Sequence, residues 1–341
     1  MNDANLSAPP YPPAPPVPPY GVPFPMNFGQ ILERIFHLMR AHIRPFAAIG
    51  LVPIGALFVL EAAIFGGLFV AGVFKQPPAQ PNVAAMLWIV FPAALLILPV
   101  ALFTYGIYYG AANYAALQAD NGLKVTAGEA LRHAWSKLGR YTWLLVLRSL
   151  IVAIPMLVLF FLVGVGGLIL GLVPNGNANA ALLFLLIPLA ALAYLGGIVY
   201  AILMSLRLSL AFPACVHEGL TAGQALRRSG VLTQGAKGRI FLALLVIYAI
   251  GYAAFMILYA VCLFIVAIGA FAGLGNIHAI TPLGYVAIGV AIVFGAAIVL
   301  LWTVLFMAAY STAFAVFYRD QCLRKQGPPP APAPAAIGSE I

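Results

Sequence analysis

The segment WLLVLRSLIVAIPMLVLFFLVGVGGLILGLV, residues 143–173, contains one charged side chain, Arg148, and no acid. A helix needs about 20 apolar residues to cross a bilayer, so this segment is long enough to span one. Other apolar segments of comparable length lie at residues 46–74, 84–116, 181–213, 240–274 and 283–317. The sequence therefore predicts six membrane-spanning helices.

The composition of the whole chain also indicates a membrane protein. Of its 341 residues, 64% are hydrophobic and 7% are charged, whereas soluble domains have about 45–50% apolar and about 25% charged residues. The charged residues are too few to cover a water-facing surface. The predicted fold class is therefore all-α, a polytopic membrane protein.

The positive charges gather in alternate connections between the predicted spans. They precede span one, separate spans two and three and spans four and five, and follow span six: Arg34, Arg40, Arg44, Lys124, Arg132, Lys137, Arg140, Arg227, Arg228, Lys237, Arg239, Arg319, Arg324 and Lys325. The opposite connections contain Lys75 and no other Lys or Arg. By the positive-inside rule, both termini are expected in the cytoplasm. The net charge of +9 then faces anionic lipid headgroups, and no nucleic-acid partner is expected.

A short signature occurs three times, as Asn27-Phe28-Gly29-Gln30, Thr126-Ala127-Gly128-Glu129 and Thr221-Ala222-Gly223-Gln224. An Asn or Thr three residues before Gln or Glu is typical of a capping box at a helix N-terminus. A helix is therefore expected to begin at each copy. The alternative is that these segments are simple loops next to the membrane.

Apolar residues recur at spacings of three and four after the first two copies, as on one face of a helix. These stripes are Leu32, Ile35, Phe36, Met39 and Ile43, and then Leu131, Ala134, Trp135 and Leu138. Such basic amphipathic helices are expected to lie in the headgroup layer. In the third copy Ser229, Gly230 and Thr233 interrupt the stripe, so that helix is expected to be partly broken.

The chain is expected to consist of a helical membrane domain between two tails. Residues 1–26 form a proline-rich cytoplasmic tail, since ten prolines between residues 8 and 25 favour an extended conformation. Residues 321–341 form a second disordered tail. The domain itself, residues 27–320, is predicted to contain three repeats of an interfacial helix and a transmembrane hairpin, at about 27–117, 126–213 and 221–318.

Three cytoplasmic segments carry a resemblance to a known family. They are RLSLAFP at residues 207–213, Glu218-Gly219 and ALRRS at residues 225–229, and FGQILER at residues 28–34 also matches the usual start. The chain resembles the integral-membrane domain found beside some bacterial glycerophosphodiester phosphodiesterases, together with its stand-alone relatives. At Gly230 those relatives carry a bulkier residue. The resemblance covers about residues 27–320 and implies a multi-pass protein of the bacterial inner membrane. It implies no enzyme activity, because the phosphodiesterase would be a separate soluble barrel.

Motifs that carry catalysis are not found in the sequence. His217-Glu218 begins like a His-Glu-x-x-His metal motif, but Thr221 stands in place of the second histidine. The only aspartates are Asp3, Asp120 and Asp320, which do not support a paired-aspartate protease. No catalytic residue, metal site or cofactor is therefore expected, and the protein is not expected to be an enzyme.

Glu61 is the only acid inside the apolar segments and is a candidate functional residue. An ionisable residue within a membrane span is costly and often functional. From their depths, a protonated, hydrogen-bonded Glu61 is expected rather than a salt bridge with Arg148. Glu61 would then serve a solute or proton site, or make a structural contact, or lie at the outer interface.

Three other charged residues are candidates near the cytoplasmic ends of the spans. Arg148 and Arg207 can extend toward the headgroups, and either can bind a lipid phosphate. Glu218 is expected to pair with Arg227 or Arg228, although the family resemblance also makes it a functional candidate.

Two functions fit these features. The first is a non-enzymatic module that binds anionic lipid or scaffolds partner membrane proteins, as the basic helices and the absence of catalytic motifs indicate. The alternative is a transporter of small solutes or lipids with a mid-membrane site near Glu61. An intramembrane enzyme is the least favoured, because it needs titratable groups that converge on one point.

Overall fold

The computed structural model describes residues 25–70, 83–172, 176–276, 279–280 and 282–326. Within these residues the chain forms ten helices and one short two-stranded hairpin. The helices are α1 (Phe28–Ala41), α2 (Ile43–Val70), α3 (Val83–Asp120), α4 (Ala127–Ser136), α5 (Leu138–Leu172), α6 (Gly176–Arg207), α7 (Ala211–Glu218), α8 (Ala222–Leu232), α9 (Lys237–Gly273) and α10 (Pro282–Gln326). Strands β1 (Leu274–Asn276) and β2 (Ala279–Ile280) pair antiparallel between α9 and α10.

Six helical stretches are long and apolar enough to cross a membrane, which confirms the predicted six-helix, all-α fold class. They are α2, α3, α5, α6 with α7, α9 and α10. Some helices extend past the apolar segments, as α5 begins at Leu138 and α3 ends at Asp120. Hydropathy identifies only the apolar part of a helix, so the predicted spans did not include these polar turns. The predicted limits at residues 74 and 173 lie outside the described residues.

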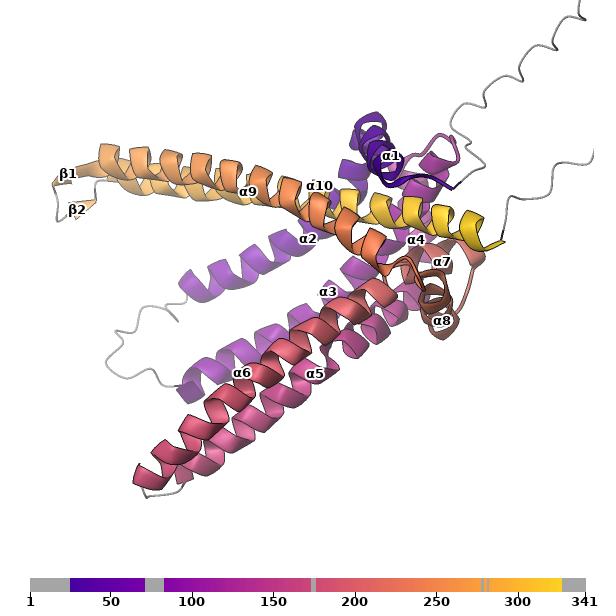
Figure 1. Ribbon diagram of the computed structural model, residues 1–341. Helices are drawn as coiled ribbons and strands as arrows, with labels where there is room; N and C mark the ends of the chain where they lie inside the picture. Colours follow the sequence, from indigo (N-terminus) through magenta and orange to yellow (C-terminus); the bar gives the residue numbers. More distant parts are fainter. Residues whose placement is uncertain (1–24, 71–82, 173–175, 277–278, 281, 327–341) are drawn as a thin grey trace, which may run out of the picture.

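Two long helical hairpins determine the shape of the molecule (Figure 1). Within each hairpin the helices lie side by side, α5 with α6 and α9 with α10, and the two hairpins diverge from a common end. We call that end the base; it contains α1, α4, α7, α8 and the adjoining ends of the long helices. We call the diverging parts of the hairpins, residues 154–172, 176–199, 250–273 and 282–301, the arms.

The core of the protein lies in the base, around α3 and α10. Helix α3 contacts α2, α4, α5, α7 and α10. Its small residues allow this close packing: Ala111 and Ala115 are buried, and a Cβ added at Gly110 would lie 2.4 Å from Tyr141 of α5. A side chain at Gly110 would therefore push α3 and α5 apart.

Each predicted start of a short helix is confirmed by a capped N-terminus. At α1, the Asn27 side chain accepts from the Gln30 N–H and the Gln30 side chain accepts from the Asn27 N–H, both at 2.9 Å. The Thr126 hydroxyl accepts from the third N–H of α4 at 3.3 Å. At α8, the Gln224 side chain accepts from the Thr221 N–H at 3.1 Å. Each cap provides partners for backbone N–H groups that the helix leaves free.

The three short helices each precede a long helix. One residue separates α1 from α2 and α4 from α5, whereas α8 and α9 are joined by a turn in which Gly235 has a φ of +79°. The alternative of simple loops at these three sites is therefore wrong. Helix α7 ends the fourth span after a break, and in the described residues no such helix ends the second. The division into three repeated modules stays a prediction.

The third short helix is regular, which corrects the expectation that it is partly broken. Helix α8 runs without interruption from Ala222 to Leu232. The residues that interrupt its apolar stripe are covered by protein, since Ser229, Gly230 and Thr233 are all buried. Their polar character therefore serves a contact inside the protein.

Helix α8 makes that contact with a break in the fourth span. The sequence predicted this span as one apolar segment that ends at residue 213. Helix α6 ends at Arg207 and α7 begins only at Ala211. The Ser229 hydroxyl donates to the Arg207 carbonyl at 2.8 Å and accepts from the Leu210 N–H at 3.1 Å. The Thr233 hydroxyl also donates to the Arg207 carbonyl. These bonds satisfy backbone groups that lose their helical partners at the break.

The face of α1 that packs differs from the predicted stripe. Ile31, Ile35 and Leu38 are buried, whereas Phe36 and Ile43, the first residue of α2, are 43% and 47% exposed. Helix α1 lies against α10, α2 and α3, so protein covers its inner face. The expectation that the whole predicted stripe faces lipid headgroups is therefore wrong.

The predicted stripe of α4 is divided in the same way. Ala130 and Ala134 are buried, and α4 packs mainly against α3. Leu131 is half-buried, and Trp135 is 67% exposed. The neighbouring helix decides which part of the stripe is covered.

Residues just outside both predicted boundaries of the helical domain take part in its structure. Helix α10 continues to Gln326 instead of ending near residue 320. Met26, which was assigned to the N-terminal tail, forms backbone hydrogen bonds with Asp320, Arg239 and Arg324. The rest of the predicted tails, residues 1–24 and 327–341, lies outside the described residues.

Candidate functional site

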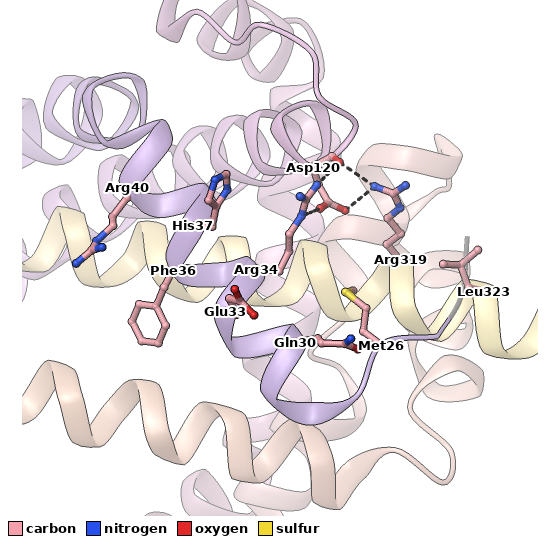
Figure 2. Close-up of a pocket in the computed structure, with 10 residues that line it drawn as sticks. All are labelled: Met26, Gln30, Glu33, Arg34, Phe36, His37, Arg40, Asp120, Arg319 and Leu323. Carbon is pink, nitrogen blue, oxygen red and sulfur yellow. Dashed lines mark hydrogen bonds and ion pairs between the residues drawn. The ribbon is translucent and has the colours of Figure 1, made fainter. Parts of the chain in front are cut away.

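Asp120, the last residue of α3, lies between two arginines in the base (Figure 2). Its side chain is 2% exposed. The carboxylate accepts from Arg34 of α1 at 2.8 Å and from Arg319 of α10 at 3.0 Å. Both guanidinium groups also donate to the Asp120 backbone carbonyl at 2.8 Å. This one residue therefore connects α1, α3 and α10.

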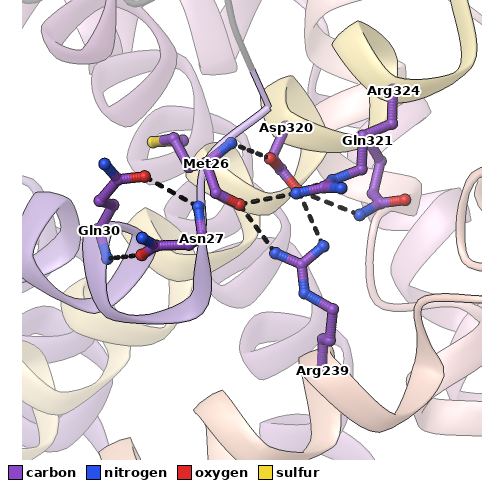
Figure 3. Close-up of polar contacts among 7 residues, drawn as sticks. All are labelled: Met26, Asn27, Gln30, Arg239, Asp320, Gln321 and Arg324. Carbon is purple, nitrogen blue, oxygen red and sulfur yellow. Dashed lines mark hydrogen bonds and ion pairs between the residues drawn. The ribbon is translucent and has the colours of Figure 1, made fainter.

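Asp320 forms a second buried centre in the base (Figure 3). Its side chain is fully buried and accepts from the Met26 N–H and from Arg324, both at 2.8 Å. Arg239 of α9 lies 3.6 Å from the same carboxylate. The Met26 carbonyl in turn accepts from Arg239 and Arg324. Asp320 thus joins the start of the described chain to α9 and α10.

Glu218, a candidate from the sequence, ends α7 and contacts two other helices. It accepts from Arg228 of α8 at 2.9 Å, which confirms the expected local pair, and from the Tyr318 hydroxyl of α10 at 2.7 Å. The hydrogen bond to Glu218 raises the pKa of the Arg228 guanidinium above its ordinary value. The contact with Tyr318 was not predicted. Glu218 therefore connects α7 and α8 to α10.

Two cavities open beside these acids. The larger, of about 620 Å³, is lined on α1 by Glu33, Arg34, His37 and Arg40 and is shown in Figure 2. The smaller, of about 320 Å³, surrounds Glu218. Buried charges are costly unless they are paired. Because Asp120, which lines both cavities, and Glu218 each already accept from two donors, we interpret these clusters as structural connections in the base.

A third cavity, of about 490 Å³, lies where α3, α5, α6, α9 and α10 meet. Its polar lining is formed by Tyr109, Arg148, Ser149, Ser205, Tyr248 and Tyr310. At a rise of 1.5 Å per residue, Arg148 lies about 15 Å along α5 from Leu138. The structure therefore places a charged and hydroxyl-rich cavity, the Arg148 cavity, within the membrane-spanning helices.

Arg148 provides the positive charge of this cavity. Its guanidinium lies 5.9 Å from the ring centroid of Phe314. The ion pairs among the described residues involve other cations, namely Arg34, Arg228, Arg239, Arg319 and Arg324. A charged side chain inside a membrane span is costly unless it is paired. An anion in the cavity would offset part of this cost.

An apolar groove adjoins the Arg148 cavity. A space of about 390 Å³ between α6 and α9 shares Ser205, Tyr248 and Tyr310 with that cavity. Its other lining residues are all apolar: Met156, Ile198, Ala201, Ile202, Leu206, Phe241, Leu244 and Leu245. We call this space the α6–α9 groove. A polar cavity and an apolar one therefore lie next to each other, with these three residues in the lining of both.

Arg207 ends α6 and is not among the residues that line the Arg148 cavity. Its side chain is exposed. A Cβ added at Gly230 would lie 3.3 Å from the Arg207 Nε. Glycine at this position thus leaves room for the Arg207 side chain beside α8.

Glu61 is half-buried on α2 and belongs to none of the cavities described above. Among the described residues, no cation forms an ion pair with it. The four candidates from the sequence are therefore not brought together in one site. Only Arg148 lines the cavity that we select.

Sequence reasoning did not single out Asp120, Asp320, Tyr248 or Tyr310. Asp320 had a detectable signal, since it follows the sixth predicted span between Arg319 and Arg324, whereas the arginines that bind Asp120 are distant in the sequence. The two tyrosines had none, because each lies in an apolar segment without a motif around it. Over the part of the chain that the structure describes, no three His, Cys, Asp or Glu side chains gather as a possible metal site.

Comparison of the chain with protein-family models, with characterised proteins and with solved structures finds no match. The resemblance to the membrane domain associated with glycerophosphodiester phosphodiesterases therefore stays a prediction.

Proposed function

We propose that this protein is a multi-pass protein of the bacterial inner membrane that binds anionic lipid and catalyses no reaction. The observation that supports the proposal is Arg148, a cation without an acidic partner among the described residues, in a cavity between membrane-spanning helices. A guanidinium group binds phosphate through charge-assisted hydrogen bonds. The tyrosine and serine hydroxyls around Arg148 supply further hydrogen-bond donors.

The lipid test compares the purified full chain in nanodiscs of phosphatidylglycerol and of phosphatidylcholine. We expect preferential retention of phosphatidylglycerol by the parent, and a loss of about tenfold or more in Arg148→Gln, because a charge-assisted contact is removed. Arg132→Gln is the matched control, since Arg132 is exposed on α4. An equal loss in both variants would show that only net charge attracts the lipid, and the proposal would fail.

We also propose that both termini lie in the cytoplasm, which places the base at the inner leaflet. The charge distribution supports this orientation. With the base at the inner leaflet, the headgroup of an inner-leaflet lipid can reach Arg148. In a chain whose cysteines are replaced by alanine, Lys124→Cys should react with a membrane-impermeant thiol reagent only after cells are opened. Lys75→Cys should react in intact cells, and the reverse result would overturn the orientation.

Lipid binding is preferred over transport because the transport hypothesis depends on Glu61, which lines none of the cavities described here. Scaffolding of other membrane proteins is compatible with lipid binding and is proposed as a second role of the exposed arms. Membership of the family suggested by residues 207–213 is likewise proposed, on the resemblance of those residues alone.

A further inference from the structure

We infer that the ligand of the Arg148 cavity is an anionic glycerophospholipid whose acyl chain lies in the α6–α9 groove and which enters sideways from the bilayer. The inference rests on the proposed function and adds the position of the acyl chain and the route of entry. A soluble anion, such as free phosphate, would bind Arg148 through the same chemistry but would leave the groove empty.

The first argument is that the cavity and the groove lie next to each other. Ser205, Tyr248 and Tyr310 line both spaces, so a single molecule can occupy the two together. These three residues therefore separate the charged part of the lining from the apolar part. A lipid has the same division, with a polar headgroup followed by hydrocarbon.

The second argument concerns the route to the cavity. On the side of the base, apolar residues one to two turns from the cavity are buried: Leu144 of α5, Ala243 of α9 and Phe314 of α10. On the side of the groove, Ile202 and Leu245 are 44% and 51% exposed. An anion that comes through the core of the base would have to pass these packed side chains, whereas a lipid in the bilayer meets an exposed apolar surface.

The third argument concerns the charge and size of the ligand. Arg148 is the one charged side chain in the lining of the two spaces, which matches a headgroup with a single negative charge. From Leu206 to Ile198 the groove follows about 12 Å of α6 at 1.5 Å per residue. This length accommodates part of an acyl chain, and the apolar lining stabilises it in proportion to the apolar area covered.

The test measures binding to the purified full chain by native mass spectrometry, with phosphatidylglycerol and with inorganic phosphate as separate probes. Ala201→Trp fills the groove, since Ala201 is half-buried in its lining. Ala193→Trp is the matched control on the same helix, where the side chain is exposed. We expect Ala201→Trp to weaken phosphatidylglycerol binding about tenfold, Ala193→Trp to leave it unchanged, and inorganic phosphate to bind weakly to all forms.

The outcomes separate the two proposals. If Arg148→Gln binds phosphatidylglycerol like the parent, the proposed function fails and this inference fails with it. If Arg148→Gln loses binding but Ala201→Trp binds like the control, or if phosphate competes fully with the lipid, Arg148 binds an anion without an acyl chain in the groove. In that case only the inference is overturned.

A second measurement does not depend on the stability of variants. Phosphatidylglycerol with a diazirine in the middle of its acyl chain is photocrosslinked to the parent chain in nanodiscs. We expect crosslinked peptides from the groove-lining parts of α6 and α9, near Ile198, Ile202 and Leu245. Crosslinks spread evenly over the arms, without enrichment at these residues, would contradict the inference.

Discussion

The base and the arms consist of similar apolar helices, but they are packed in different ways. In the base, Phe46, Tyr141 and Phe317 are fully buried, and two buried aspartates connect helices far apart in the sequence. In the arms, Phe160 and Phe184 are 76% and 85% exposed. Lipid can cover such side chains without packing by protein, whereas the polar groups of the base need partners within the chain. The same hydropathy therefore leads to two kinds of structure.

The largest expected effect is in the buried ion pairs of the base. Asp120→Asn should lower the free energy of unfolding in detergent by about 3–5 kcal/mol, because it leaves Arg34 and Arg319 without their buried carboxylate. Glu129→Gln removes the same charge at an exposed site on α4 and should have little effect. Equal thermal stability of the two variants would show that the base does not depend on this pair.

The next test compares glycines of the two regions. Gly110→Ala in the base should destabilise the protein, because the new Cβ would lie 2.4 Å from Tyr141. Overpacking costs about 1–3 kcal/mol and outweighs the gain in helix propensity of about 0.5–1 kcal/mol. At Gly164 in an arm, an added Cβ meets nothing within 4 Å, so Gly164→Ala should be neutral or stabilising. If thermal unfolding showed the same change in stability for both variants, the base and the arms would not differ in packing as described.

A smaller difference in stability is expected between two variants that each lose one hydroxyl group. Ser229→Ala in the base removes the partner of the Leu210 N–H at the break between α6 and α7, and should cost about 1–2 kcal/mol. Thr303→Val in α10 removes a hydroxyl that bonds only to Val299 of its own helix among the described residues. That change should stay within about 0.5 kcal/mol, because the backbone keeps its helical bond. A larger loss for Thr303→Val than for Ser229→Ala in denaturant titrations would contradict this account of the break.

The smallest effect is the pH dependence of one contact in the base. Burial, with a further contribution from Lys137, lowers the pKa of His133 below its ordinary value of 6.5. Its ring stacks on Tyr114 at 4.1 Å and lies 3.3 Å from the Tyr141 hydroxyl. The unfolded chain binds the His133 proton more readily than the folded protein does. The contribution of neutral His133 to stability is therefore complete above pH 6.5 and declines as the pH falls through the lower pKa of the folded protein. Thermal unfolding from pH 7.5 to 5 should show the decline, and His133→Gln should reduce it.

The local features of the fold could be predicted from the sequence because they depend on neighbouring residues. The caps at Asn27, Thr126 and Thr221 are local, since cap and partner are three residues apart. The six spans follow from long runs of apolar side chains. The site was only partly predictable: Arg148 was identified from its place in a span, but the tyrosines that share its cavity come from α3, α9 and α10.

Composition and charge order thus specify a six-helix membrane protein, the points where its short helices begin and the connections between spans that carry its positive charge. These properties depend on each segment's own interaction with lipid and water. Tertiary packing decided which face of α1 is buried, where the fourth span breaks, and that Asp120 binds arginines 86 and 199 residues away. Such contacts join segments distant in the sequence, and their geometry depends on how the helices pack. The position of Arg148 beside the α6–α9 groove likewise depends on tertiary packing.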